Sequence, residues 1–368
     1  MTQANYGRKV WSQLNREFSA FSILPKRPWE RSGWRVITDR PSFTVGGGVA
    51  ENATLPETTK PAFQHIAAKP KTIVHNFDMS EIAMSLADKD DGLGDLRAVL
   101  KEEMGKHHAE HINKMLLTPL ECLYQAGTHP TADLVDNDLT SLYKIVASEA
   151  EFDACCAANS AIFSLRGATL CDDVLYELYG ETRDVGSSWM NAYVDYGDYS
   201  TVSSGGTGRR NLTLNMINTA LRELQIRGGI PKIILTGYDT ILALGELLQA
   251  QERYLGATEV LPTHNGVRGV RGREVGYKVA TYHDIPIIPC KDMGTTGEGA
   301  GISDIFILDT DYIFFCTLKP TEYFEGGVDS GDPFGVGKLG NCGLYRTIGE
   351  TICTFIKGQG KITNIQRE

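Results

Sequence analysis

One long helical pattern, DLRAVLKEEMGKHHAEHINKMLL, limits the folds open to this chain. It follows Gly92 and Gly94 and stops before Pro119, so the predicted helix covers about residues 91–117. At about 1.5 Å per residue this helix is about 40 Å long, enough to cross a whole domain. One stripe at helical spacing contains Leu93, Leu96, Leu100, Met104, His107, His111 and Met115, which predicts that these two histidines face the interior.

The residues before this helix contain aromatic and basic side chains but little sustained hydrophobic period. Prolines interrupt the segment up to about residue 45, which favours an extended arm over a packed domain. Residues 46–70 are rich in Gly, Pro, Thr and Ala and predict a long loop or an open hairpin, a type of segment that commonly serves contact or function. KTIVHNFDMS (71–80) then alternates as a strand, with His75 on its apolar face.

Later parts of the sequence alternate helix with strand and then become β-rich. A helix is predicted at 213–227, followed by the buried strand IPKIILTG and a helix at 240–256. Strand patterns follow, with a tight turn at 309–311 and a C-terminal pair of strands that turns at 358–360. The length of 368 residues suggests about two domains, and the mixture of elements gives the class α+β.

Charge is distributed unevenly along the chain. Residues 1–40 carry eight basic and three acidic side chains, a net charge of +5, whereas the whole chain carries −10. A basic, aromatic-rich arm on an acidic body suggests a tail that lies against another subunit or a polyanion, with a solvated N-terminal helix as the alternative. The pI near 5.4 argues against nucleic-acid binding over the whole surface.

Cysteine usage and hydropathy indicate the compartment. Eight cysteines without a C-x-x-C pair are typical of reduced thiols in a cytosolic setting. The N-terminus lacks the apolar core of a signal peptide, and no apolar run approaches the roughly 18 residues of a membrane span. We expect a soluble protein made in the cytoplasm, without a membrane partner.

HHAEH (107–111) is the stretch that most suggests chemistry. It matches His-x-x-Glu-His, the spacing of inverted zinc metalloproteases, in which two histidines hold Zn²⁺ and the glutamate polarises a water. Such a site needs a third protein ligand, and glutamates are too common here for one to be singled out. A histidine pair in an apolar stripe is also typical of packing. We expect packing, and a zinc-dependent hydrolase using His107, Glu110 and His111 is the alternative.

Other candidate motifs fail on their own residues. FGVGKLG resembles the end of a phosphate loop, but Leu339 stands where Ser or Thr would hold Mg²⁺. SSGGTGRR precedes a helix but has no preceding strand of Rossmann character, and ADLVDNDLT lacks the glycine of a calcium loop. There is no G-x-S-x-G elbow and no recognisable catalytic cysteine. The sequence therefore predicts no enzyme, no catalytic residue, no metal site and no cofactor.

The order of these elements suits a building block. VAENATLPETTKPAFQHIAAKPKTIVHNFDMSEIAM with the following helix resembles the arm, extended loop, strand and spine helix of the major capsid proteins of tailed double-stranded DNA viruses, the Hong Kong 97-type capsid fold. VGYKVATYHDIPIIPCKDM and DIFILDTDYIFFCTL are similar to two later strands of that family, and KITNI to its closing strand. The resemblance spans about residues 44–368.

This resemblance implies a division of the chain. It would comprise an N-terminal arm, an extended loop, a peripheral domain with the spine helix at about 91–117, an axial domain, and C-terminal strands returning to the peripheral domain. Their expected bounds are 1–45, 46–76, 77–231, 232–342 and 343–368.

The implied function is structural. The resemblance implies self-assembly through pentamers and hexamers into an icosahedral shell around packaged double-stranded DNA, in a virion capsid assembled in the host cytoplasm. Further implied partners are scaffolding, portal and cement proteins. Contacts of the arm with neighbouring subunits, or with DNA without sequence specificity, are expected at Trp11, Trp29, Arg31, Trp34 and Arg35. The histidines would pack the spine helix, with a pH sensor during maturation as a hypothesis.

Two further points follow from the resemblance. Many family members begin with a long scaffolding segment, so we expect scaffolding to be supplied by another protein, unnecessary or already cleaved away. An encapsulin-type compartment shares the fold but encloses enzymes, and the basic arm argues against it. A non-enzymatic binding domain is the remaining alternative and would stay monomeric.

Overall fold

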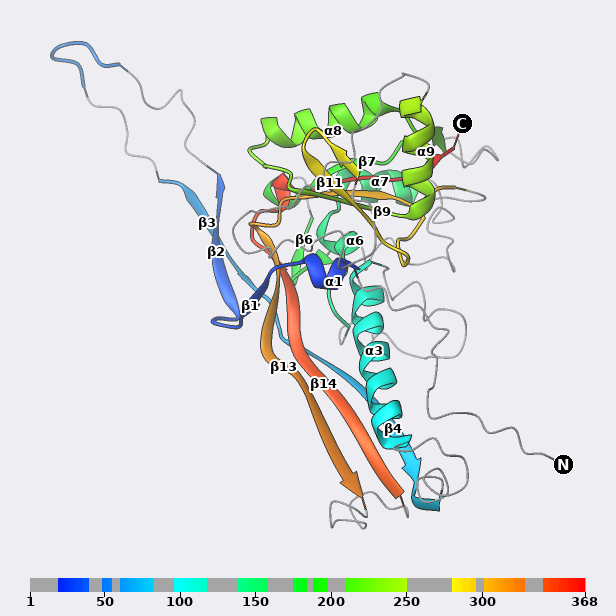
Figure 1. The fold of residues 1–368 in the computed structure, drawn as a ribbon. Helices are drawn as coiled ribbons and strands as arrows, with labels where there is room; N and C mark the ends of the chain where they lie inside the picture. Colours follow the sequence, from blue (N-terminus) through cyan, green and yellow to red (C-terminus); the bar gives the residue numbers. More distant parts are fainter. Residues whose placement is uncertain are drawn as a thin grey trace.

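The computed structural model describes residues 19–39, 48–54, 60–82, 96–117, 138–157, 175, 177–183, 188–197, 209–249, 280–295, 301–327 and 340–367. These residues form three parts (Figure 1). The body is a six-stranded sheet with its helices, and the stem is a four-stranded sheet with the long helix α3 (Leu96–Leu117). The hairpin consists of β2 (Gly33–Asp39) and β3 (Ala62–Ala67).

The body sheet is mixed and buried at its centre. β9, β12 and β15 are buried along their whole lengths, as expected for strands covered on both faces. β9 runs parallel to β11 and antiparallel to β12, while β15 runs antiparallel to β12 and parallel to β7. The strand order is β10 (Ala280–Tyr282), β11 (Ile285–Pro289), β9 (Ile233–Thr236), β12 (Ile305–Leu308), β15 (Gly360–Ile362) and β7 (Tyr193–Asp195).

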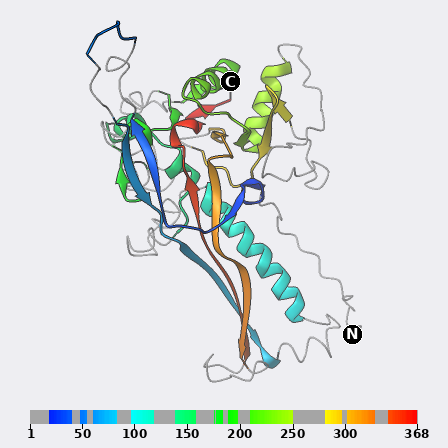
Figure 2. The same cartoon turned by 90° about the vertical axis from the view of Figure 1, so that its left-hand side faces the viewer.

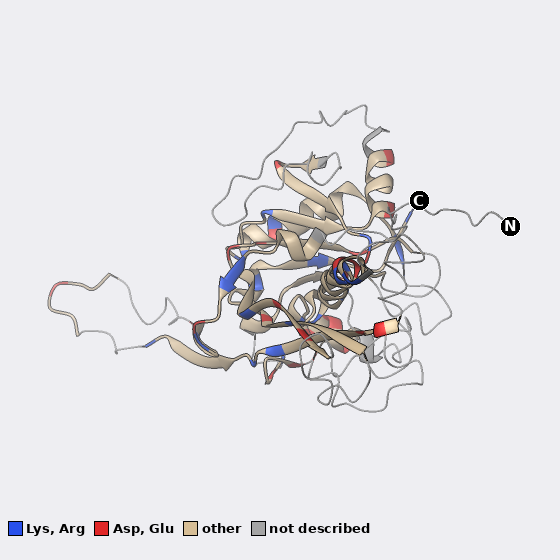
Figure 3. Ribbon diagram, turned by 60° about the horizontal axis from the view of Figure 1, so that its bottom comes forward, with Lys and Arg blue, Asp and Glu red and all other residues tan. Residues whose placement is uncertain are grey.

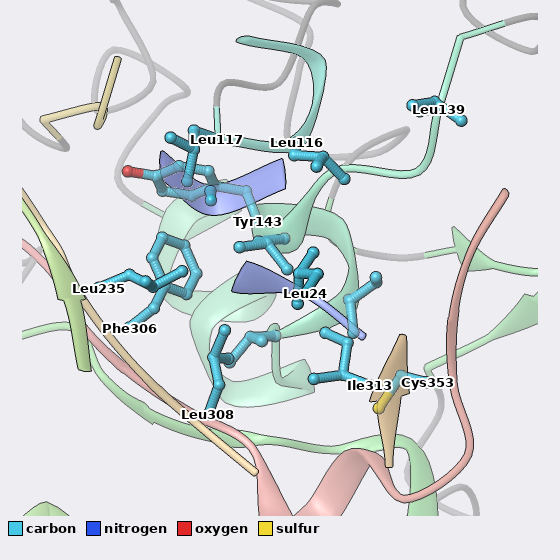
Figure 4. Packing of buried hydrophobic residues seen from close by; sticks show 14 of the residues in the cluster. Leu24, Leu116, Leu117, Leu139, Tyr143, Leu235, Phe306, Leu308, Ile313 and Cys353 are labelled. Atoms are coloured by element: carbon cyan, nitrogen blue, oxygen red, sulfur yellow. The ribbon is translucent and has the colours of Figure 1, made fainter. Parts of the chain in front are cut away.

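Alternate residues of the body strands fill two separate cores. Leu235, Phe306 and Leu308 enter one core, which also receives the C-terminal end of α3 (Figure 4). Ile305 and Ile307 enter the other core, where α8 (Leu214–Ile226) and α9 (Tyr238–Gln249) pack. Because side chains of a strand alternate between the two faces of its sheet, one short apolar strand supports both cores.

A buried ion pair links a helix to the centre of this sheet. Lys361 of β15 lies 2.8 Å from Glu151 of α7 (Glu149–Ala157), and both side chains are completely buried. Burial raises the pKa of Glu151 and lowers the pKa of Lys361, and the opposite charge of each opposes these shifts. The charged pair therefore depends on both partners being present.

The stem extends away from the body with α3 alongside its sheet (Figure 2). The C-terminal residues of α3, including Leu116 and Leu117, are buried in the first core, so the helix is anchored in the body. β14 pairs along its length with β13 on one side and β4 on the other. The strand order is β1 (Lys26–Pro28), β13 (Ile313–Gly327), β14 (Gly340–Cys353) and β4 (Lys71–Ser80).

Shorter elements complete the described residues. The helices are α1 (Ser19–Ile23), α6 (Leu142–Ile145), η4 (Ser188–Met190) and η6 (Ile356–Gly358). Two small ribbons pair β5 (Glu177–Leu178) with β6 (Glu181–Thr182) and β8 (Arg210–Asn211) with β16 (Ile365–Gln366). None of the helices in these residues is long and apolar enough to cross a lipid bilayer.

Several predicted elements are present, but their partners differ from expectation. The long helix, the strand at 71–80 and the helix before IPKIILTG are confirmed. The expected C-terminal strand pair is wrong, because β14 lies in the stem whereas β15 lies between β12 and β7 in the body. Turn residues specify where a chain reverses, and they do not specify which sheet receives the next strand. The segment beyond Gln249 of the predicted helix 240–256 lies outside the described residues.

Strand pairing also shifts the expected boundaries. β2 lies within the expected arm (1–45), yet it pairs with β3 of the expected loop. β13 lies within the expected axial segment (232–342), yet it belongs to the stem sheet. Hydrogen bonds to a distant strand decide these assignments, and a linear division of the sequence does not contain that information.

Candidate functional site

The hairpin projects from the rest of the molecule (Figures 1 and 3). β2 pairs with β3 in antiparallel register from Gly33 opposite Ala67 to Asp39 opposite Ala62, with one irregularity after Ile37. Residues 48–54 lie beyond it, at the end farthest from the body in Figure 1, and they are exposed. Within the described residues, the hairpin is therefore the part best placed to reach another molecule.

One face of the hairpin packs on its own chain. Trp34 lies opposite Ile66 in the register, and its ring centre is 5.4 Å from that of Tyr179 in an edge-to-face contact. Ile66 is buried, and Gln64 Nε2 donates a hydrogen bond of 3.1 Å to Glu181 Oε2. These contacts fix the inner face of the hairpin.

The outer face exposes apolar side chains to solvent. Ile37 lies opposite Phe63, and these side chains are 53% and 62% exposed. Arg35 and His65, the neighbouring cross-strand pair on this face, are also exposed. Scattered exposed apolar residues are ordinary, but a two-stranded ribbon in water has little stability of its own, and a third strand or another surface is normally needed. The outer face therefore keeps an apolar surface that contacts among the described residues do not bury.

A basic groove lies at the base of the hairpin. Its rim carries Arg27, Arg31, Arg35 and His65, with Glu30 as its acidic member, and its volume is about 950 Å³. The floor consists of Phe314, Cys316 and Ile352. The Arg27 guanidinium lies 4.0 Å from the centre of the Phe314 ring, a cation–π contact. Burial raises the pKa of the Cys316 thiol, so the floor is uncharged at neutral pH.

The structure separates the predicted arm contacts into two kinds. Trp29 and Trp34 are half-buried and pack against the cluster that contains Ala68, so much of their apolar surface is used within the chain. Arg31 and Arg35 are exposed on the groove, and their contact with another molecule stays a prediction. Trp11 lies outside the described residues.

Sequence reasoning missed the two most exposed apolar residues of the hairpin, Ile37 and Phe63. Their signal was present as alternation in GWRVITD and AFQHIA. The pairing was not predicted because GWRVITD lies in the expected arm and AFQHIA in the expected loop.

The HHAEH residues lie where α3 packs on the stem sheet, but the predicted orientation is wrong for one of them. His108 is buried, whereas His107 is exposed and His111 is half-buried. The buried line runs through Gly105 and Ile112, because Gly105 faces the Tyr345 side chain, whose hydroxyl would lie 3.3 Å from an added Cβ. The true interface is thus rotated by about one residue from the predicted stripe.

The histidines meet a fourth ring from the sheet. His75 of β4 has its ring centre 4.6 Å from that of His111 and 4.9 Å from that of His108. Burial, followed by repulsion from the other histidines, lowers the pKa of both His75 and His108 to about 4. These two rings therefore stay neutral between about pH 5 and 8, and the pH-sensor hypothesis for His107 and His111 stays a prediction.

Glu110, the proposed catalytic residue of the hydrolase alternative, is used elsewhere. Its Oε1 lies 3.3 Å from Lys291 Nζ and 3.8 Å from Lys114 Nζ. A carboxylate oxygen that already pairs with two lysines is poorly placed to take a proton from a metal-bound water. The geometry gives the hydrolase alternative no support.

Comparisons with known proteins identify the fold. No family model matches the chain, and a search of curated proteins gives no match. Among solved structures, the capsid asymmetric unit of Cyanophage A-1(L) matches with a TM-score of 0.65 and 12% identity, over 99% of this chain and 97% of that one. The capsid of the native GTA particle matches with a TM-score of 0.57 and 13% identity, over 98% and 94%.

A third match is to a different kind of shell. The holo-SrpI encapsulin complex from Synechococcus elongatus matches with a TM-score of 0.51 and 9% identity, over 99% of this chain and 93% of that one. At these identities the likeness shows the fold alone. The resemblance to the capsid fold predicted from the sequence is therefore confirmed at the level of the fold.

Proposed function

We propose that this chain is the subunit of a self-assembling icosahedral shell, the major capsid protein of a tailed double-stranded DNA virus. The observation that carries the proposal is the projecting hairpin with its exposed Ile37–Phe63 pair, in a chain that shares its fold with capsid subunits over almost its full length. Apolar side chains that one chain leaves exposed would be buried by another copy of the chain in an assembly. No catalytic step is part of the proposal.

The hairpin of one copy is suited to contact a different surface on a neighbouring copy. A stable protein interface buries roughly 800 Å² on each partner, and an extended ribbon laid over a neighbour adds area without enlarging the body. Contacts of this kind join different patches on successive copies and close into rings when the rotation permits. Pentamers and hexamers are such rings.

We assign the three parts of the fold to the parts of a capsid subunit as follows. The body would be the axial domain, the stem with α3 the peripheral domain, and the hairpin the extended loop. The pairing of β13 with β14, which also pairs with β4, supports placing β13 with the stem, and the position of β15 supports placing it with the body.

The enclosed cargo is proposed to be double-stranded DNA, contacted without sequence specificity. The basic groove supports this assignment, because Arg31 and Arg35 are exposed and arginines bind phosphates irrespective of base sequence. Phosphate binding by these arginines also distinguishes the proposed capsid from an encapsulin-type compartment that encloses enzymes. Scaffolding, portal and cement proteins remain proposed partners, and the virion the proposed location.

Assembly is tested on the purified full chain by sedimentation velocity and negative-stain electron microscopy. We expect closed shells or separate pentamers and hexamers, and we expect a double variant, Ile37→Ser with Phe63→Ser, to shift the chain to monomers. Ile226→Ser on α8, where Ile226 is 70% exposed, is the matched control. A wild-type chain that stays monomeric, alone and with co-expressed scaffolding, would overturn the proposal. An equal loss of assembly in the Ile226→Ser control would show that the hairpin has no special role in assembly.

Cargo is tested by binding to a mixed-sequence DNA duplex at several salt concentrations. Each lost phosphate contact lowers the salt slope by about one, so Arg31→Gln with Arg35→Gln is expected to weaken binding and flatten this dependence. Arg222→Gln, an exposed arginine of α8, serves as the control. Binding that is absent, or unchanged in the double variant, would favour the encapsulin-type alternative.

A further inference from the structure

Three histidines from two elements converge beside the stem sheet. His107 and His111 lie on one face of α3, one turn apart, and His75 approaches from β4. One ring nitrogen from each of the three lies within 4.8 Å of the corresponding nitrogens of the others. His107 is exposed while the other two are half-buried, so solvent reaches the cluster from one side.

Packing alone does not account for this arrangement. Imidazole rings inside a protein normally have hydrogen-bond partners for their nitrogens. Among the described residues, however, the rings of His107 and His111 have no hydrogen-bonding side chain as a partner, and they contact the ring of His75 and each other. Three imidazoles that face one another with lone pairs to share are the donor set preferred by transition-metal ions.

The spacing is close to that of a metal centre. Zn–N bonds are about 2.0–2.1 Å, so nitrogens at neighbouring corners of a tetrahedron lie about 3.3 Å apart. The three nitrogens, all within 4.8 Å of one another, would have to move closer by about 1.5 Å at most. His107 is free to make this movement because it is exposed, and the helix already holds His107 and His111 one turn apart.

A chain of hydrogen bonds orients His75. Its Nδ1 lies 2.7 Å from His108 Nδ1, His108 Nε2 lies 2.7 Å from Thr347 Oγ1, and Thr347 Oγ1 lies 2.8 Å from Thr321 Oγ1. One proton per bond allows either direction along this chain, and the direction suited to metal binding has His75 donating to His108, His108 to Thr347, and Thr347 to Thr321. Nε2 of His75 then keeps its lone pair. Metal-bound histidines typically donate their other N–H in this way.

Glu110, the acidic residue of HHAEH, is already held by two lysines. Lys114 lies one turn from Glu110 on α3 and pairs with it, and Glu110 pairs as well with Lys291. Glu110 is therefore excluded as a ligand, and a water molecule would occupy the fourth coordination position.

We propose that His75, His107 and His111 bind one divalent transition-metal ion, Zn²⁺ by preference, in a three-histidine site with water as the fourth ligand. The ion would clamp α3 to β4 and fix the angle between the helix and the sheet of the stem. Three histidines and a water make an open zinc site, and the role we assign to it is the clamp between α3 and β4. This inference does not rest on the proposed function, since a single chain contains all three ligands.

The test uses tag-free full-length chain that has been stripped with a chelator. Co²⁺ is titrated in and followed by visible absorption, and Zn²⁺ is then added in competition. We expect one Co²⁺ per chain, the intense d–d bands of a four-coordinate site, and displacement by Zn²⁺. Zn²⁺ is also expected to raise the melting temperature, because it binds the folded state.

Variants separate the site from adventitious binding. His107→Gln alters an exposed residue and is expected to weaken Co²⁺ binding at least tenfold with the fold intact by circular dichroism; His75→Gln is expected to abolish the four-coordinate spectrum. His283→Asn is the control, because Asn tolerates the positive φ of 49° at this turn position. Absence of a stoichiometric four-coordinate spectrum in the wild type, or equal binding by His107→Gln and the control, would overturn the site. Either result leaves the assembly test unaffected.

Discussion

The body and the hairpin differ in how much of their apolar surface is buried by contacts within one chain. In the body, β9, β12 and β15 are buried on both faces, and the charged side chains of Lys361 and Glu151 form a buried ion pair. In the hairpin, one face packs on Tyr179 while the other leaves Phe63 exposed. The body is therefore stable through its own contacts, whereas the hairpin carries a surface that only a second molecule can bury.

The stem lies between these extremes. Its sheet is buried where β13 leaves the body and becomes exposed farther along, and α3 is buried most completely at its C-terminal end. Stability should accordingly decrease from the body outward, since local stability follows the number of buried apolar contacts. Three predictions test this gradient, taken from the largest expected effect on the free energy of unfolding to the smallest.

The largest effect is expected from breaking the buried ion pair in the body. Lys361→Met leaves the Glu151 carboxylate buried without a partner, and removal of one member of such a pair typically costs about 3–5 kcal/mol. Denaturant unfolding of the dissociated chain measures the loss. Combining Lys361→Met with Glu151→Leu is expected to recover most of it, and Lys319→Met, at an exposed position, is the control. A loss below about 1 kcal/mol for Lys361→Met would contradict the account.

An intermediate effect is expected at Glu350, where the stem meets the body. Burial raises the pKa of its carboxyl to about 7, although Thr140 and Thr351 both donate backbone hydrogen bonds of 2.8 Å to Oε1. Because this pKa lies above the unfolded value, the stability contributed by protonation is complete below about pH 4.5 and is lost as pH rises through about 7. The wild-type chain should therefore lose stability from this group across that range.

Glu350→Gln isolates this contribution, because glutamine keeps an oxygen for both backbone donors and carries no charge. We expect the variant to exceed the wild type by about 1–3 kcal/mol at pH 8 and to match it near pH 4.5. Unfolding at a series of pH values gives the difference, with exposed Glu177→Gln as the control. A variant less stable than the wild type at pH 8 would refute the assignment.

The smallest effect on unfolding is expected in the hairpin. Phe63→Ser removes a side chain that is 62% exposed, so the dissociated chain should change by no more than about 0.5 kcal/mol. The same substitution is expected to raise the concentration needed for assembly at least tenfold, measured by light scattering. A destabilisation of the single chain as large as that of Lys361→Met would mean that the hairpin belongs to the folded core.

Local features of the fold were predictable from local residues. Thr213 precedes α8 in extended conformation, and Gly228 follows it with a positive φ of 88°, as helix-boundary patterns predict. The hairpin of β10 and β11 turns at His283 and Asp284, both with positive φ, in the two-residue loop that such strands favour. Each of these features depends on residues only a few positions apart.

The candidate sites depended on distant residues and were predicted only in part. Arg31 and Arg35 could be recognised as exposed basic residues of an arm, but their position opposite Phe314 required the pairing of β1 with β13. The cluster of His75 with His107 and His111 is another example. The sequence showed the helical histidines and predicted no metal site, because nothing local revealed that β4 would bring a third ring to them.

Hydrogen–deuterium exchange on assembled particles and on the dissociated chain tests the central claim most directly. We predict that amides of β2 and β3 exchange rapidly in the dissociated chain and at least tenfold more slowly in the particles, while β9 and β12 are protected equally in both states. Equal exchange of the hairpin in both states would contradict the claim that other copies of the chain complete it.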